Sequence, residues 1–280
     1  LVNLLLTIYG ISDGVFEYRY LAFSQNLAWV EKTPTFFGEA WSLALDEWFY
    51  LLMPVIIGCL FFLPISRKAS FISASCVLIV LPTIGRILHE APTDFLQWDA
   101  QIRRITIYHL DATGWGVLAA SVNKWRSNWW RERVGQKAVA GTMMMLAGLF
   151  FVIGLLHPEW MNVFYYRIGN SFSITLMAGG TFLLLPWLTS LRAAWKPTDW
   201  IIGKLSTFSY SIYLVHLPLI FILKFIFEIN EKSSGAYMSM IVVLWLGLVF
   251  MISGVVFHFF EKPIADLRES FTKRVDASPF

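Results

Sequence analysis

The sequence predicts an all-α, polytopic transmembrane helix bundle, and composition and the length of the apolar runs both lead to it. Hydrophobic residues make up 57% of the 280 residues, charged residues only 15%, and the mean hydropathy is +0.60. A soluble core of this size could not bury so much apolar surface. Many of the runs reach the roughly 20 residues that a helix needs to cross hydrocarbon, and none alternates like a membrane barrel strand.

The apolar runs give the expected elements in chain order. Leu1–Ile11 is long enough for about half of a span. Seven longer runs follow, at residues 41–62, 69–88, 104–122, 137–156, 171–191, 205–227 and 236–259. We therefore expect about seven full spans plus an N-terminal half-span. Because the sequence starts with Leu1 in mid-span, and no signal peptide precedes it, we expect an N-terminally truncated protein.

Basic residues alternate between successive loops. The loops after the first, third, fifth and seventh runs are rich in lysine and arginine, with Arg67, Arg126, Lys196 and Lys262 as examples, whereas the intervening loops are acid-leaning. Cytoplasmic loops of membrane proteins carry an excess of lysine and arginine. We therefore expect an integral membrane protein whose basic loops and C-terminus lie in the cytoplasm.

The remaining composition excludes several other classes. The net charge of +3 is ordinary for a membrane protein with basic loops, and no basic run indicates nucleic-acid binding. Cys59 and Cys76 lie in apolar runs and are expected to be packing residues rather than a disulfide. No spacing of His, Cys and acidic residues resembles a metal site, so we expect none.

Ionisable side chains inside apolar spans are costly and mark candidate functional sites. Asp46 and Glu47 lie in the first full run, Arg86 in the second and Asp111 in the third. Asp46, Arg86 and Asp111 fall at similar depth toward the outer leaflet, which indicates a polar cavity that opens outward. The alternative is an ion-pair network that only holds helices together. Asp46 and Glu47 are about 100° apart on a helix, so we expect one of them to be peripheral.

A histidine near the middle of a later run is the remaining candidate. His216 lies in the run at 205–227, two residues before Pro218. A proline inside a span frees a backbone carbonyl one turn earlier, and a histidine can satisfy such a group. His216 is therefore either part of a functional site or a hydrogen-bonded packing residue.

Several segments resemble the membrane acyltransferase-3 family in the same order. WSLALDEWFYLLMP at Trp41–Pro54 resembles the family signature W-S-L-x-x-E-E-x-F-Y-x-x-x-P. FSQNLAW, PTIGRIL, YHLDATGWGVLAA, LSTFSYSIYLVHLP and FEKP resemble further family segments. Two departures stand out: Asp46 occupies a position where the family usually has Glu, and His109 one where Arg is common.

The resemblance implies one integral-membrane acyltransferase domain over residues 1–280, lacking its first two to three helices, in the bacterial inner membrane. It implies O-acyl transfer, of acetyl above all, to a hydroxyl of an envelope carbohydrate, a lipid or a small molecule. Acyl-CoA, with acetyl-CoA foremost, would be the co-substrate, with no bound cofactor, and membrane lipid would be a partner. The alternatives are a transporter or flippase of lipid-linked sugars, and an inactive relative.

The resemblance also implies roles for Asp46, Glu47, Arg86, Asp111 and His216 as catalytic residues. Asp46 or Glu47 would orient a catalytic histidine that the family places in its first helix. Arg86 would neutralise donor phosphate or oxyanion charge, and Asp111 and His216 would line the acceptor side. The only histidine on these runs with an acid one turn away is His258, with Glu261, and that pair is expected at the cytoplasmic boundary rather than near Asp46. Activity is therefore expected of the full-length protein and not of this fragment.

The loop charges make the topology testable. Cysteines introduced at Arg67, Arg126 and Lys196 should resist a membrane-impermeant thiol reagent in intact cells, because the basic loops are expected in the cytoplasm. Permeabilised cells provide the positive control. Labelling of any of the three from outside intact cells would contradict the orientation.

Overall fold

A computed structural model gives the fold, and it describes most of the chain. The described residues are Thr7, Gly10 and residues 16–30, 36–89, 92, 94–155, 163–191, 196–228 and 234–267. They form helices and no β-strand, which confirms the all-α class. Apart from Thr7 and Gly10, the expected half-span Leu1–Ile11 lies outside the described residues.

The seven apolar runs form seven long helices. These are α2 (Ala40–Phe61), α3 (Arg67–Leu88), α5 (Thr106–Trp125), α7 (Val134–Leu155), α8 (Val163–Leu188), α9 (Lys196–Ile226) and α10 (Gly235–Val256). Five short helical elements were not expected: η1 (Tyr18–Ala22), α4 (Phe95–Trp98), η2 (Asp99–Arg103), α6 (Ser127–Arg131) and η4 (Phe257–Glu261).

Six helices in the described part of the chain are long and apolar enough to cross a membrane, one fewer than expected. The difference is α5, which is 20 residues long but carries polar groups that include Thr106, His109 and Asp111. It packs against both α3 and α8. A helix covered by protein tolerates polar side chains that a lipid-facing helix does not. The six apolar helices make this an integral membrane protein.

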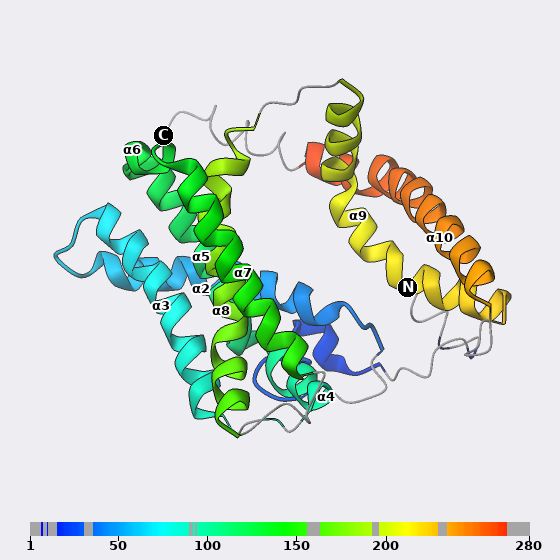
Figure 1. The fold of residues 1–280 in the computed structure, drawn as a ribbon, viewed down its shortest axis with the longest axis horizontal. Coiled ribbons are helices and arrows are strands. Elements are labelled where there is room, and N and C mark those ends of the chain that lie inside the picture. The colour runs from blue at the N-terminus through cyan, green and yellow to red at the C-terminus, as the bar shows by residue number, and fades with distance from the viewer. Residues whose placement is uncertain are drawn as a thin grey trace. The chain divides into compact units, whose positions relative to one another are not determined.

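The chain divides into two compact units. The larger contains residues 17–32 and 40–192, and the smaller contains residues 1–16, 33–39 and 193–280. In the larger unit α7 lies along α8, and α3 lies along α5 (Figure 1). In the smaller unit α9 packs on α10, where Leu219, Leu223 and Val249 form the core.

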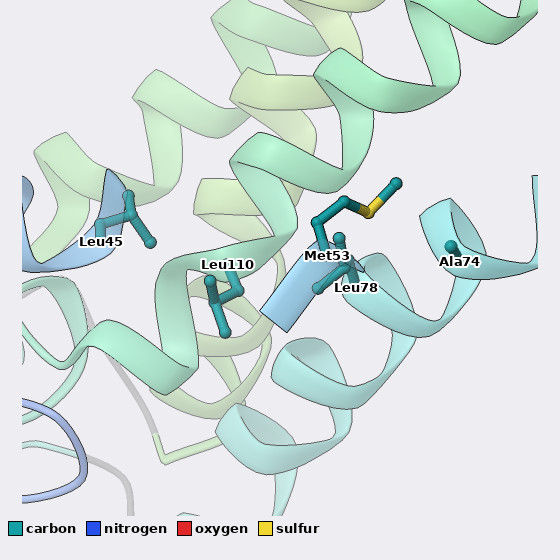
Figure 2. Close-up of a cluster of buried hydrophobic side chains, with 5 residues drawn as sticks. All are labelled: Leu45, Met53, Ala74, Leu78 and Leu110. Atoms are coloured by element: carbon teal, nitrogen blue, oxygen red, sulfur yellow. The ribbon is translucent and has the colours of Figure 1, made fainter. Parts of the chain in front are cut away.

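Buried apolar side chains join the first three long helices of the larger unit. Leu45 and Met53 of α2, Ala74 and Leu78 of α3, and Leu110 of α5 form one cluster (Figure 2). Close backbone contact supports it, because a Cβ at Gly114 of α5 would lie 2.9 Å from the Cβ of Leu78. This interface holds α5 against α3 one turn from Asp111.

Two glycines bring α7 and α8 together in the same unit. A Cβ at Gly141 would lie 2.6 Å from the carbonyl oxygen of Gly180, and a Cβ at Gly180 would lie 2.6 Å from that of Gly141. Small residues allow such close approach between helices in membranes, where dispersion contacts replace the hydrophobic effect. The contact fixes α8, which supplies part of the candidate site.

Candidate functional site

Arg86 and Asp111 form a fully buried ion pair in the larger unit. Nη2 of Arg86 lies 2.7 Å from Oδ2 of Asp111, and both side chains are 0% exposed. A charge moved out of water is stable in a protein only if it is paired and its remaining donors are satisfied. The expectation that these two residues meet is confirmed.

The other donors of Arg86 reach three helices. Nε donates to the carbonyl of Ser171 on α8 at 3.1 Å, and Nη1 donates to the carbonyl of Tyr108 on α5. Nη2 also donates to the hydroxyls of Thr83 at 3.1 Å and Thr175 at 2.6 Å. The guanidinium, which starts from α3, therefore ties α3, α5 and α8 together.

Thr83 and Thr175 complete the hydrogen-bonded cluster around Arg86 and Asp111, and the sequence did not predict them. The hydroxyl of Thr175 donates to Oδ2 of Asp111 and lies 3.1 Å from that of Thr83. Thr83 donates to the carbonyl of Ile79 on its own helix at 2.8 Å. Threonine is common in membrane helices, so nothing in the sequence distinguished these two from the others.

Some polar atoms beside the ion pair have no hydrogen-bond partner in the described part of the chain. They include Oδ1 of Asp111 and Nδ1 of His109, both buried. Buried polar groups are normally satisfied by protein or by water. The cluster thus retains one acceptor on Asp111 that a buried water molecule can occupy.

The first residue of the signature segment packs over this cluster. The ring of Trp41 makes an edge contact with His109, with centroids 5.7 Å apart, and the Arg103 guanidinium lies 4.8 Å from the Trp41 ring centroid. Asp99 in turn pairs with Arg103 and with Arg104. Aromatic and cation–π contacts of this kind fix the start of α2 next to α5.

The segment FSQNLAW has a clear structural role. Gln25 donates to the carbonyl of Ala40 at 2.9 Å, and Asn26 donates to the carbonyls of Trp41 and Arg104. The Asn26 carbonyl accepts the backbone N–H of Thr106 at 2.9 Å. The first N–H groups of a helix have no partner within it, so this segment caps α5 and joins it to the start of α2.

Asp46 and Glu47 do not join the buried pair. Both side chains are exposed, and neither makes an ion pair with Arg86 among the described residues. Leu45 and Met53 occupy the buried face of α2, which turns the neighbouring Asp46 away. The expected three-residue cluster is therefore a two-residue pair, and catalytic roles for Asp46 and Glu47 stay predictions.

His216 pairs with a residue that the sequence reasoning missed. In the smaller unit its Nε2 lies 3.7 Å from Oε1 of Glu39, with side-chain exposures of 32% and 7%. Nδ1 of His216 lies 2.7 Å from the carbonyl of Tyr213, and the Tyr213 hydroxyl donates to the carbonyl of Glu39 at 2.9 Å. Spacing along the helix of His216 could not identify this acid, because Glu39 comes from a segment remote in sequence.

Burial and hydrogen bonding have opposite effects on the protonation of the Glu39 carboxyl. Burial raises the pKa of the Glu39 carboxyl above its usual range, while His216 and the backbone N–H of Leu217 act in the opposite direction. The bond to Tyr213 confirms that His216 hydrogen-bonds to its own helix near Pro218. It also leaves Nε2 directed at a carboxyl group.

The two other motifs of the smaller unit bind each other. The Ser211 hydroxyl of the SYSIYLVH segment donates to Oε2 of Glu261 in FEKP at 2.7 Å. Nδ1 of His258 lies 2.8 Å from the carbonyl of Gly254 on its own helix. In the described residues no group of three or more His, Cys, Asp and Glu side chains could hold a metal ion, and Cys59 and Cys76 are free.

The role of Thr175 can be tested with a matched pair of variants. Thr175→Val should lower the free energy of unfolding in detergent by about 1–3 kcal/mol, because it removes a hydroxyl that serves a buried ion pair. Thr181→Val is the control, since the exposed Thr181 hydroxyl donates only to Met177 on its own helix. Equal effects of the two variants, measured by denaturant titration, would contradict this role.

Comparison with known proteins finds a matching family and a relative. The family model described as "Acyltransferase domain" matches residues 3–264. The chain is 26% identical over 277 residues to the protein named "Putative peptidoglycan O-acetyltransferase YrhL" of Bacillus subtilis (strain 168). That alignment covers 96% of this chain and 40% of the relative, so the chain spans about two fifths of the relative's length. No solved structure matches.

The match agrees with the positions of the motifs in the structure. The signature segment forms the start and middle of α2, Arg86 and Asp111 pair across α3 and α5, and Ser211 binds Glu261. The matched range runs through all seven long helices. The chain is a membrane protein that belongs to the acyltransferase 3 family.

Proposed function

We propose that the protein transfers an acetyl group from acetyl-CoA to a hydroxyl of an envelope glycan at the bacterial inner membrane. Family membership supports acyl transfer over the transporter and flippase alternatives. The name of the Bacillus relative, which is similar over nearly the whole chain, supports a glycan acceptor. The observation that carries the chemistry is the pairing of His216 with Glu39.

The hydrogen bonds of His216 determine which nitrogen can act as a base. A carbonyl oxygen only accepts, so Nδ1 carries the hydrogen that is donated to Tyr213. In the neutral ring the lone pair is then on Nε2, which faces Glu39. The ring is 32% exposed, which leaves room for a hydroxyl group to reach Nε2.

In the proposed reaction, Nε2 of His216 first accepts a proton and then gives it up. Nε2 takes the proton of the acceptor hydroxyl as its oxygen attacks the thioester carbonyl of the acetyl donor. The negative charge of the Glu39 carboxylate, which lies on the same side of the ring as Nε2, stabilises the imidazolium formed in this step, and the Tyr213 carbonyl holds the opposite ring nitrogen. The carbon–sulfur bond then breaks, the thiol of CoA leaves with the proton, and the acetyl ester remains on the glycan.

Arg86 and Asp111 have a different part in this proposal. The Arg86 guanidinium is fully buried, and its three nitrogens donate to groups of the protein itself. It is therefore a positioning residue rather than the expected ligand of donor phosphate or oxyanion. Oδ1 of Asp111 is equally buried and retains an acceptor for a bound water.

His216→Gln should lower acetyl transfer by about 10²–10⁴-fold, because it removes a general base while keeping a side chain that can donate to Tyr213. His258→Gln is the matched control, since His258 makes the same kind of bond to its own helix at Gly254. The natural gene product is assayed with acetyl-CoA carrying a labelled acetyl group and isolated peptidoglycan. Full activity of His216→Gln, or equal losses in both variants, would contradict the assignment.

The substrate is tested in cells. The gene is expressed in a bacterium whose wall lacks acetyl esters, and wall fragments are analysed by mass spectrometry before and after mild base. Base-labile acetyl groups on the glycan that depend on His216 support the proposal. Acetylation confined to lipids or small metabolites would overturn the choice of acceptor.

A further inference from the structure

A hollow lies at the end of α3, apart from the residues assigned to the proposed reaction. It has a volume of about 540 Å³ and is lined by Gly85, Leu88, His89, Gln101 and Tyr108. These residues come from the last turn of α3, from η2 and from the first turn of α5, all in the larger unit. None of them belongs to the ion pair or to the His216–Glu39 pair.

The lining matches a neutral, hydroxyl-rich ligand. The Gln101 amide can both donate and accept, as can the Tyr108 hydroxyl, and these are the capacities that sugar hydroxyls require. The Tyr108 ring and the Leu88 side chain add apolar surface for the C–H face of a sugar ring. Among the residues that the structure describes, no side chain that lines the hollow is a carboxylate, an ammonium or a guanidinium.

Two arginines follow Gln101 in the chain but do not line the hollow. Arg103 and Arg104 share the single carboxylate of Asp99, so one positive charge is left over beside the hollow. The residues that line the hollow offer hydrogen-bonding groups from Gln101, His89 and Tyr108 instead.

Tyr108 is held rigidly and is joined to the buried cluster. Its hydroxyl lies 3.4 Å from Nδ1 of His89, and the two rings make an edge contact with centroids 5.4 Å apart. A Cβ at Gly85 would lie 2.9 Å from the Tyr108 ring, so a glycine lets that ring approach α3 closely. The Tyr108 carbonyl accepts from Arg86, which links the wall of the hollow to the ion pair.

We infer that this hollow of the larger unit is a subsite for a neutral sugar ring of a glycan. Gln101 and the Tyr108 hydroxyl bind sugar hydroxyls, and the Tyr108 ring packs on the sugar face. The inference rests on the proposed function, because it takes the bound sugar from the class of acceptor proposed there. The volume lies within the ~300–1,000 Å³ typical of small-molecule sites.

Equilibrium binding of N-acetylglucosamine tetrasaccharide to the natural protein in detergent tests the subsite. Gln101→Leu should weaken binding about tenfold, because it removes amide hydrogen bonds at nearly constant size. Tyr108→Phe should weaken binding in the same direction while keeping the ring and the carbonyl that accepts from Arg86. Gln97→Leu is the matched control, since Gln97 is exposed on the neighbouring α4 and does not line the hollow.

The outcomes separate the subsite from the proposed function. Unchanged binding in Gln101→Leu and Tyr108→Phe overturns the subsite even if the protein acetylates glycan. Absence of tetrasaccharide binding to the unsubstituted protein overturns it as well, as does tighter binding of an anionic oligosaccharide of equal length. Loss of affinity in both variants supports the subsite, even if the acetylation assay shows that another acceptor is modified.

Discussion

The buried guanidinium of Arg86 is the constraint on which the larger unit depends. A charge in a membrane protein interior is costly unless a counter-charge and hydrogen-bond acceptors surround it. Asp111 supplies the counter-charge from α5, and Ser171 and Thr175 supply acceptors from α8. These contacts require α3, α5 and α8 to meet at one level, with fixed rotation about each axis.

Other features of the unit follow from that requirement. Gly114 lets α5 approach α3 closely, and Gly141 and Gly180 let α7 approach α8 closely. Asn26 caps α5 one and a half turns before Asp111 and joins it to α2. Since helices in lipid gain little from hydrophobic association, such close contacts and polar bonds provide most of the specificity of packing.

The sequence predicted the helices well because apolar runs of membrane length are a strong signal. Of the seven runs, α5 alone falls short of the apolar composition of a span in the described part of the chain, since it has protein on two sides and carries His109 and Asp111. The sequence also placed Arg86 and Asp111 at one depth, and they do meet. Depth alone does not specify which face of a helix a residue occupies.

That limit explains the errors in the predicted site. Asp46 was grouped with the pair by depth, although Leu45 and Met53 show that the buried face of α2 lies elsewhere. Glu39 was missed because spacing along the sequence relates His216 only to acids on its own helix, while Glu39 precedes α2. Thr83 and Thr175 became identifiable only through contacts between helices.

A double-mutant cycle on Arg86 and Asp111 tests the central claim most directly. The free energy of unfolding in detergent is measured for Arg86→Met, Asp111→Leu and the double variant. If the pair organises the unit, each single variant should lose about 3–5 kcal/mol, since it leaves one buried charge without its partner. The double variant should then be more stable than the sum of the losses implies, by about 2–3 kcal/mol. Losses that add to within about 0.5 kcal/mol would show that the two charges act independently and would contradict the account.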